Sequence, residues 1–256
     1  MARVSIFLIT LVLMVGMVGC GTQVQYTLSV SSTSGGNVTH PGIGTFTYPA
    51  GAVVLLVAEP AEGYSFVNWT GNISTIADVN NATTTVIMNG HYFVTANFVQ
   101  GQLIRNWYDL NAVRDDLGGY YILMNNLDST TAGYEELASE TANGGKGWQP
   151  IGNSTGNFTG TFDGQGHEIR DLFINRPGEE SVGLFGYVGV AGVIKNAGTV
   201  DIAVTSEVFV GALVGYNLGA VRNSYSAGNV AGGGAVGGLV GNSESGIVSN
   251  CYATVS

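Results

Sequence analysis

The stretch GALVGYNLGAVRNSYSAGNV, residues 211–230, decides the fold of this 256-residue chain. Glycine and small apolar residues recur through it, and Arg222 is its one charged residue. Glycine-rich segments either cradle a phosphate, which indicates chemistry, or shape the backbone, which indicates architecture. The surrounding sequence distinguishes the two.

Parts of this stretch recur before and after it. Residues 219–223 (GAVRN) match residues 192–196 (GVIKN) and 246–250 (GIVSN), so successive copies are 27 residues apart. A four-residue pattern, Gly/Ala-Leu-hydrophobic-Gly, precedes each copy at residues 183–186, 212–215 and 238–241. Three copies of two motifs in a fixed order indicate a repeat architecture.

Elementary geometry predicts the fold that this repeat forms. A 27-residue coil of short strands cannot bury its apolar face alone, so neighbouring coils must stack about 4.8 Å apart. The repeat therefore predicts a parallel β-solenoid in which equivalent residues lie above one another. We expect Asn196, Asn223 and Asn250 to form an amide ladder and Tyr225 to stack on Tyr252. The glycines are expected to turn the corners of the coil, where positive φ is needed, or to let backbones approach closely.

These residues resemble the GLUG motif family, named for its Gly-Leu-hydrophobic-Gly core, over residues 183–256. Residues 148–174 look like the segment that commonly precedes such repeats. The resemblance implies a surface protein, since GLUG-type repeats occur in adhesins and in the non-catalytic part of some secreted metallopeptidases. The third copy lacks the Gly-x-Val continuation seen at residues 228–230, so we expect a chain truncated at its C-terminus.

Residues 25–99 have a different pattern. Apolar and polar residues alternate in six segments separated by turn residues: 26–30, 44–48, 52–58, 64–69, 83–88 and 92–98. This period of two predicts a small all-β domain. Phe66 and Trp69 are expected in its core rather than on a ligand platform.

This first unit resembles the divergent internalin-type B repeat of bacterial surface proteins. The resemblance rests on glycine, proline and aromatic positions: residues 36–38, 41–44, Tyr48, Gly51, residues 58–60 and 63–66, Trp69 and residues 94–98. It implies a surface spacer or interaction module and brings no catalytic residues to this chain.

Between the two units the pattern changes. Residues 100–106 are expected to be a linker, and the i, i+3, i+7 spacing of apolar residues in 107–117 predicts an amphipathic helix. Residues 120–127 predict a strand, and residues 131–145 predict a second short helix with its loop. These helices are expected to cap the first coil, within a segment 107–182 that also holds the first solenoid strands.

The N-terminus predicts export. Residues 1–19 contain Arg3 and then a continuous apolar run, which is typical of a signal peptide. Residues 17–20 (MVGC) resemble a lipobox, so we expect lipid on Cys20 and a protein held at the outer side of a membrane. Ordinary secretion with an incidental cysteine, or an uncleaved anchor, are the alternatives.

Composition and charge limit the classes of partner that we expect. The formal net charge is −10 and basic residues are sparse, so nucleic acid is not an expected partner. Hydrophobic residues make up 45% of the chain, which argues against disorder. If Cys20 carries lipid, Cys251 has no disulfide partner, and its place opposite Ser224 and Ala197 in the repeat indicates a small core residue.

Three local matches to catalytic motifs lack their structural context. Residues 232–237 fit the dinucleotide pattern, but a repeat strand follows instead of a helix. Residues 152–156 fit the nucleophile-elbow pattern, but the nearest acid and base follow within one expected hairpin. Residues 167–171 (HEIRD) resemble a zinc motif, but they alternate like a strand, which places His167 and Glu168 on opposite sides. We expect no metal and no cofactor.

One small cluster of charged residues leaves an enzymatic alternative open. Asp163, Arg170 and Asp171 are a sparse version of the acidic cluster with a basic partner that a β-helix polysaccharide lyase would need. Asp163 alone falls far short of the six to eight oxygen ligands that Ca²⁺ takes.

Together these observations predict an all-β protein, with a small β domain followed by a β-helix-like parallel solenoid that has a short helical N-terminal cap. We expect a non-enzymatic, lipid-anchored cell-surface protein whose partners are the membrane and glycans, cell-wall polymers or surface proteins. The expected binding face carries Tyr225, Tyr252, Asn196, Asn223 and Asn250. The alternatives are a polysaccharide-acting β-helix enzyme, the non-catalytic front part of a larger secreted protease, and a purely structural stalk.

Overall fold

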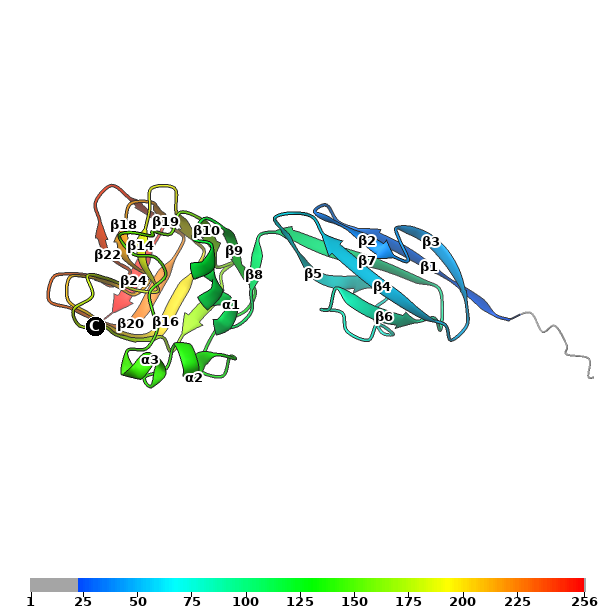
Figure 1. Ribbon diagram of the computed structural model, residues 1–256, viewed down its shortest axis with the longest axis horizontal. Coiled ribbons are helices and arrows are strands. Elements are labelled where there is room, and N and C mark those ends of the chain that lie inside the picture. The colour runs from blue at the N-terminus through cyan, green and yellow to red at the C-terminus, as the bar shows by residue number, and fades with distance from the viewer. Residues whose placement is uncertain (1–22, 256) are drawn as a thin grey trace, which may run out of the picture.

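The computed structural model describes residues 23–255, so the expected signal peptide and Cys20 lie outside the described residues. Two β units follow one another along the long axis of the molecule, with β8 (Gln102–Ile104) between them (Figure 1). Strands dominate both units, which confirms the all-β prediction. In the part of the chain that the structure describes, no helix is long and apolar enough to cross a membrane.

The N-terminal unit has two sheets, with strand orders β3-β1-β7-β5 and β2-β4-β6. β1 pairs with β7 in parallel, and the other neighbours pair antiparallel. The strands are β1 (Gln25–Ser32), β2 (Gly36–His40), β3 (Gly44–Pro49), β4 (Val53–Pro60), β5 (Tyr64–Gly71), β6 (Thr83–Ile87) and β7 (Tyr92–Gln100).

Alternation along these strands builds the core of this unit. Leu28 and Leu56 are fully buried, one from each sheet, and outward neighbours such as Leu55 remain exposed. Trp69 is 1% exposed and donates its indole N–H to the Asn81 carbonyl at 3.0 Å. Phe66 packs against Trp69 with ring centroids 5.6 Å apart. The predicted core positions of both aromatic residues are confirmed.

The second unit is a parallel β-solenoid whose strands form four ladders. Their orders are β23-β19-β15-β10-β9-β8, then β11-β16-β20-β24 with β12 also on β16, then β13-β17-β21 and β14-β18-β22. The strands of the first ladder after β8 are β9 (Tyr120–Leu123), β10 (Thr161–Asp163), β15 (Val193–Lys195), β19 (Ala220–Arg222) and β23 (Ile247–Ser249). The second ladder contains β11 (Glu168–Arg170), β12 (Phe173–Asn175), β16 (Gly198–Thr205), β20 (Tyr225–Ala231) and β24 (Tyr252–Val255). The remaining strands are β13 (Ser181–Val182), β17 (Phe209–Gly211), β21 (Ala235–Gly237), β14 (Phe185–Val188), β18 (Val214–Asn217) and β22 (Val240–Ser243).

The register of the first ladder reproduces the sequence period. Val193 pairs with Ala220, and Ala220 pairs with Ile247, so partners in adjacent coils are one repeat apart. Neighbouring strands within these four ladders pair in parallel. The predicted parallel solenoid is therefore confirmed.

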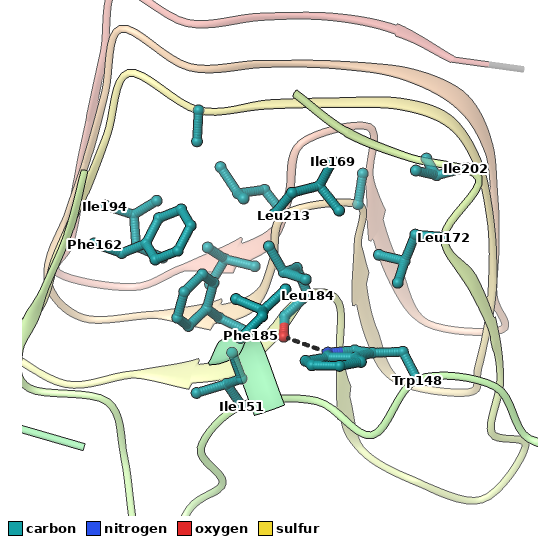
Figure 2. Close-up of a cluster of buried hydrophobic side chains, with 14 of the residues drawn as sticks. Trp148, Ile151, Phe162, Ile169, Leu172, Leu184, Phe185, Ile194, Ile202 and Leu213 are labelled. Carbon is teal, nitrogen blue, oxygen red and sulfur yellow. Dashed lines mark hydrogen bonds between the residues drawn. The ribbon is translucent and has the colours of Figure 1, made fainter. Parts of the chain in front are cut away.

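Inward side chains of successive coils fill one continuous core. Phe162 stacks below Ile194 in the first ladder, and both are fully buried. Figure 2 shows these residues facing Leu184 and Phe185 across the interior. Trp148 closes the cluster, and its indole N–H donates to the Leu184 carbonyl at 3.1 Å. This burial stabilises coils that could not fold singly.

The helices are shorter than expected. α1 spans Trp107–Ala112 and continues as the 3₁₀ turn η1 (Val113–Asp115), where the sequence predicted a helix to residue 117. Asp116 leaves the helical conformation because its side chain accepts a hydrogen bond from the Gly118 N–H, which forms a turn instead. α2 (Tyr134–Leu137) and α3 (Ala142–Gly145) lie in the segment expected to hold a second helix.

The expected linker is not a free connection. Residues 102–104 form β8, which pairs with β9 and becomes the outermost strand of the first ladder. Gly101 separates β7 from β8 with φ 110°, and its N–H donates to the Gly63 carbonyl at 2.9 Å. The linker expectation therefore needs correction, because the backbone of this segment is used in a sheet.

The corners of the repeat are turned by asparagine, so the expectation that glycine turns them is wrong. Asn196, Asn223 and Asn250 follow β15, β19 and β23 with φ of 54°, 50° and 54°. Within residues 211–230, Gly228 is the one glycine with positive φ. Gly215 has an ordinary φ, but a Cβ there would collide with the backbone of β13. Its role is close backbone approach.

Candidate functional site

The expected binding face, named here the candidate face, comprises Asn196, Asn223, Asn250, Tyr225 and Tyr252. The asparagines each follow a strand of the first ladder. Tyr225 and Tyr252 begin strands of the second ladder, two residues after Asn223 and Asn250. The structure therefore brings both groups to the same corner of the solenoid. Whether this face binds a ligand stays a prediction.

The asparagines form the expected amide ladder. Asn223 donates from Nδ2 to Asn196 Oδ1 at 3.2 Å, and Asn250 donates in the same way to Asn223 at 3.3 Å. Asn196 in turn donates to Asp163 Oδ1 at 3.0 Å. The ladder therefore runs through successive coils and ends on a carboxylate, which the repeat pattern alone did not include.

Asp163 is held ionised in this position. Its side chain is buried, and Lys195 Nζ lies 3.0 Å from Oδ2. Burial alone would raise the pKa of Asp163, but hydrogen bonds from Asn196, the Gln165 N–H and Lys195 together lower it. A carboxylate with this environment stabilises the first coils and is not disposed to donate a proton near neutral pH.

The two tyrosines stack as the repeat predicts. Their ring centroids are 5.1 Å apart and their planes differ by 4°. Both rings lie on the outer side of the solenoid, with Tyr252 60% exposed. Tyr225 covers Gly198 in the coil below, where a Cβ would approach the tyrosine ring to 2.7 Å. Tyr225 therefore lies between a glycine and a second tyrosine.

Glu168 joins this face, although the sequence analysis placed it in a false zinc motif. Glu168, Gly198 and Tyr225 occupy the same position in three successive coils. Because Gly198 has no side chain, the Tyr225 hydroxyl reaches past it and donates to Glu168 Oε1. A register alignment of the upstream strand with the repeats would have revealed this pair.

Arg170 completes the cluster beside Glu168. Its guanidinium forms ion pairs with Glu168 and with Asp201, the latter at 3.4 Å. The Tyr225 hydrogen bond and Arg170 lower the pKa of Glu168, although partial burial opposes them. The hydrogen bond to Glu168, together with burial, raises the pKa of Tyr225 to about 12. Asp171, the third member of the sparse acidic cluster, accepts from the Ser129 N–H at 3.0 Å.

A second aromatic group lies on another side of the solenoid and was missed by the sequence analysis. Tyr187 and Tyr216 stack with centroids 4.7 Å apart, and Phe209 meets Tyr216 edge to face at 5.1 Å. The Tyr216 hydroxyl donates to Glu244, which raises the pKa of Tyr216 to about 12. The signal was available, since each tyrosine follows the last glycine of a Gly/Ala-Leu-hydrophobic-Gly pattern.

The remaining candidates from the sequence are the HEIRD segment and the two cysteines. His167 precedes strand β11, so the HEIRD segment has strand geometry as predicted. In residues 23–255, no group of three or more His, Cys, Asp or Glu side chains is arranged to hold a metal ion. Cys251 is half-buried against the solenoid core, and its thiol donates to the Ser249 carbonyl at 3.2 Å. Cys20 lies outside the described residues.

Comparison with known proteins finds one family match in each unit. Residues 26–102 match the family model of the divergent InlB B-repeat domain, and residues 232–256 match that of the GLUG motif. The chain is 44% identical over 110 residues, 43% of its length, to halomucin of Haloquadratum walsbyi. It is 36% identical over 126 residues, 47% of its length, to a protein of Evansella cellulosilytica named as a Gly-rich membrane protein.

The matches cover small parts of these relatives, 1% of halomucin and 14% of the Evansella protein. No solved structure matches the chain significantly. The two family matches fall on the two units that the structure separates. The chain thus consists of a divergent InlB B-repeat domain followed by a parallel β-solenoid that contains a GLUG motif.

Proposed function

We propose that this chain is a non-catalytic interaction protein of the cell surface, held at the membrane by lipid on Cys20. One observation carries the proposal: the polar side chains of the candidate face bind one another from coil to coil. They stabilise a long, rigid surface of amide groups and aromatic rings. Such a surface suits the recognition of glycans or other surface polymers, which pack sugar rings on aromatic side chains.

The electrostatics of the face support a non-catalytic role. A glycan-cleaving enzyme needs a carboxylic acid whose pKa is raised toward the working pH. Asp163 and Glu168 instead have lowered pKa values, because each accepts several hydrogen bonds and faces a cation. Both carboxylates therefore stay ionised and paired, which favours a structural role over general acid catalysis.

The comparisons support a location at the surface. InlB-type and GLUG repeats are modules of surface proteins, and one relative is named as a membrane protein. The proposal of a lipid anchor rests on the lipobox-like sequence MVGC at residues 17–20. Expression of the full chain with a labelled fatty acid tests it: label should enter the protein and disappear in Cys20→Ser, with the protein released from membranes. Unlabelled, membrane-free parent protein would refute the anchor.

The binding face is tested separately. We expect saturable binding of the full chain to at least one member of a panel of glycans and cell-wall polymers, with the polymer left uncut. A Tyr225→Ala/Tyr252→Ala double variant should lose that binding. Tyr108→Ala is the matched control, because Tyr108 is 50% exposed and belongs to α1, which contributes no residue to this face. Binding that survives the double variant, or cleavage of the polymer, would contradict the proposal.

A further inference from the structure

A separate cavity of about 230 Å³ lies between η1 and the loop that follows Trp148. Since a single water needs only about 10–15 Å³ of such space, the cavity has room for a small organic ligand such as one sugar unit. The residues that define its chemistry are Arg114, Leu117, Gln149, Pro150, Asn153 and Thr155. None of them belongs to the candidate face.

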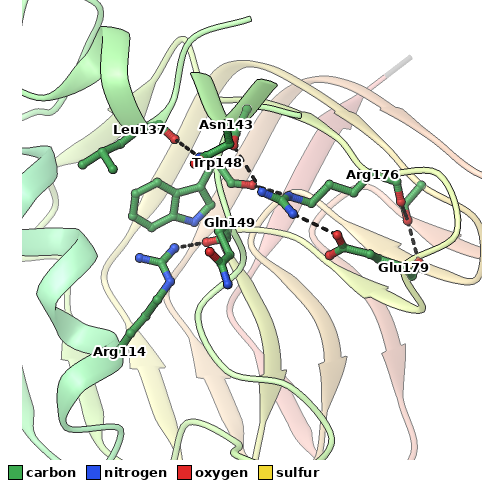
Figure 3. A network of polar contacts seen from close by, with 9 residues as sticks. Arg114, Leu137, Asn143, Trp148, Gln149, Arg176 and Glu179 are labelled. Atoms are coloured by element: carbon green, nitrogen blue, oxygen red, sulfur yellow. Dashed lines mark hydrogen bonds and ion pairs between the residues drawn. The ribbon is translucent and has the colours of Figure 1, made fainter. Parts of the chain in front are cut away.

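Arg114 is anchored without a counter-ion. Its guanidinium lies 4.3 Å from the centre of the Trp148 ring, and it donates to the Gln149 carbonyl (Figure 3). It also donates to the Asn111 side chain and carbonyl. Among residues 23–255, no carboxylate forms an ion pair with it, and its Nε–H has no hydrogen-bond partner. This half-buried cation is therefore held by dipoles and a ring face, without a direct ion pair.

The neighbouring Arg176 has the ion-pair partner that Arg114 lacks. Arg176 is also buried beside Trp148, where it donates to the Trp148 carbonyl at 2.8 Å, but it has Glu179 as an ion-pair partner at 2.8 Å (Figure 3). Burial and repulsion from Arg176 lower the pKa of Arg114 to about 10, with Asp115 opposing them in part. An anion bound in the cavity would supply the charge that the protein does not.

The walls of the cavity define the rest of the ligand. Leu117 and Pro150 provide apolar surface, which suits the C–H face of a sugar ring. Asn153 accepts three hydrogen bonds at Oδ1, from the Thr155 N–H and hydroxyl and the Gly156 N–H, so its loop is firmly shaped. Its Nδ2 has no partner among the described residues and is free to donate to a hydroxyl.

We propose that this cavity binds the carboxylate of a uronic acid unit, with Arg114 as the anion-binding residue and the Asn153 loop against the sugar ring. The planar guanidinium matches a carboxylate in shape and charge. The formal net charge of −10 opposes the approach of any anion, so affinity must depend on Arg114, the local cation that has no ion-pair partner. The site is independent of the candidate face and of the lipid anchor.

The test is an NMR titration of the full chain with glucuronate, with glucose, acetate and sulfate as comparisons. We expect saturable binding of glucuronate, no binding of glucose at equal concentration, and weaker binding of acetate and sulfate. Arg114→Gln should weaken glucuronate binding by about tenfold or more. Arg222→Gln is the matched control, since it removes the same charge from an exposed position on β19.

A second variant, Asn153→Asp, tests the same proposal if Arg114→Gln fails to fold. The aspartate retains the oxygen that accepts the loop hydrogen bonds, yet adds a carboxylate beside Arg114 that competes with the ligand. It should therefore abolish glucuronate binding while the thermal midpoint stays close to that of the parent. Unchanged glucuronate binding in either folded variant would overturn the proposal. Equal affinity for glucose, acetate or sulfate would overturn the assignment to a sugar carboxylate.

Discussion

At the residue scale, asparagine turns the corners of the coil, a role that the sequence predicts for glycine. Both residues tolerate a left-handed backbone, so the repeat alone does not say which of them turns the corner. Asn223 combines the two functions that a corner of a stacked coil needs, since its backbone has φ 50° and its side chain bonds to the coils on both sides. The ladder itself could be predicted, because a fixed period places equal residues above one another.

The two functions of Asn223 can be separated by substitution. Asn223→Ala loses the ladder bonds and places alanine in a left-handed conformation, so we expect the free energy of unfolding to fall by about 1–2 kcal/mol. Asn223→Gly loses the bonds but relieves the backbone, so its loss should be smaller. Urea unfolding of both variants measures the difference. Equal stability of parent and Asn223→Ala would contradict this account of the corner.

The Tyr225–Glu168 pair predicts a dependence on alkaline pH. The folded pKa of Tyr225, about 12, lies above its ordinary value of 10.0, so folding favours the protonated phenol. Its stabilisation is fully present below pH 10 and is lost as the pH rises toward 12. The difference in unfolding free energy between the parent and Tyr225→Phe should therefore shrink over this range in urea titrations. A difference that stays constant from pH 8 to beyond 11 would show that the hydrogen bond is absent.

At the element scale, strands were predictable wherever the sequence alternates or repeats, and connections were not. The sequence predicts a linker over residues 100–106, because so short a segment shows no periodicity, yet β9 offers residues 102–104 a free sheet edge. The helix at 107–117 was predicted too long because Leu117 fits its apolar spacing, whereas the turn at Asp116 ends it. The Tyr225–Glu168 contact was missed because the period was not extended upstream to β11.

The close approach of backbones at Gly215 gives a prediction for the strands. A Cβ at this position would meet the Ser181 carbonyl carbon at 2.6 Å and cannot be relieved by a side-chain movement. We expect Gly215→Ala to destabilise the solenoid by about 3 kcal/mol or more, as overpacking against a backbone does. Gly118→Ala is the control, because its nearest contact would be an ordinary 3.5 Å. Similar unfolding midpoints for the two variants would refute the close-approach role.

At the scale of the whole molecule, the chain has two separate hydrophobic cores, one in each unit. Figure 1 shows the two units joined through β8. This division was predicted from the change of pattern near residue 100, since period-two segments give way to a 27-residue repeat. The cavity at Arg114 could not be predicted, because η1 and the loop after Trp148 are 35 residues apart and meet only in the folded solenoid.

Two cores predict two responses to core damage. Trp69→Ala removes a fully packed ring from the first unit and should cost that unit about 3–5 kcal/mol. The solenoid should keep its own transition in calorimetry, because Trp69 belongs to the hydrophobic core of the first unit and the solenoid has a separate core. One shared transition that moves as a whole would contradict the separation. Val190→Ala, at a side chain 79% exposed, is the control and should change neither transition.

The central claim is that the 27-residue repeat stacks in register as a parallel solenoid, and a disulfide tests it most directly. Arg222 and Ser249 are direct partners in adjacent coils, where neighbouring strands lie about 4.8 Å apart. In a chain whose native cysteines are replaced by serine, we predict that Arg222→Cys/Ser249→Cys forms an intramolecular disulfide under mild oxidation, measured by mass spectrometry. The shifted pair Arg222→Cys/Ile247→Cys should stay reduced, because its Cα atoms are about 8 Å apart, beyond disulfide reach. Oxidation of the shifted pair in preference to the registered pair would contradict the solenoid.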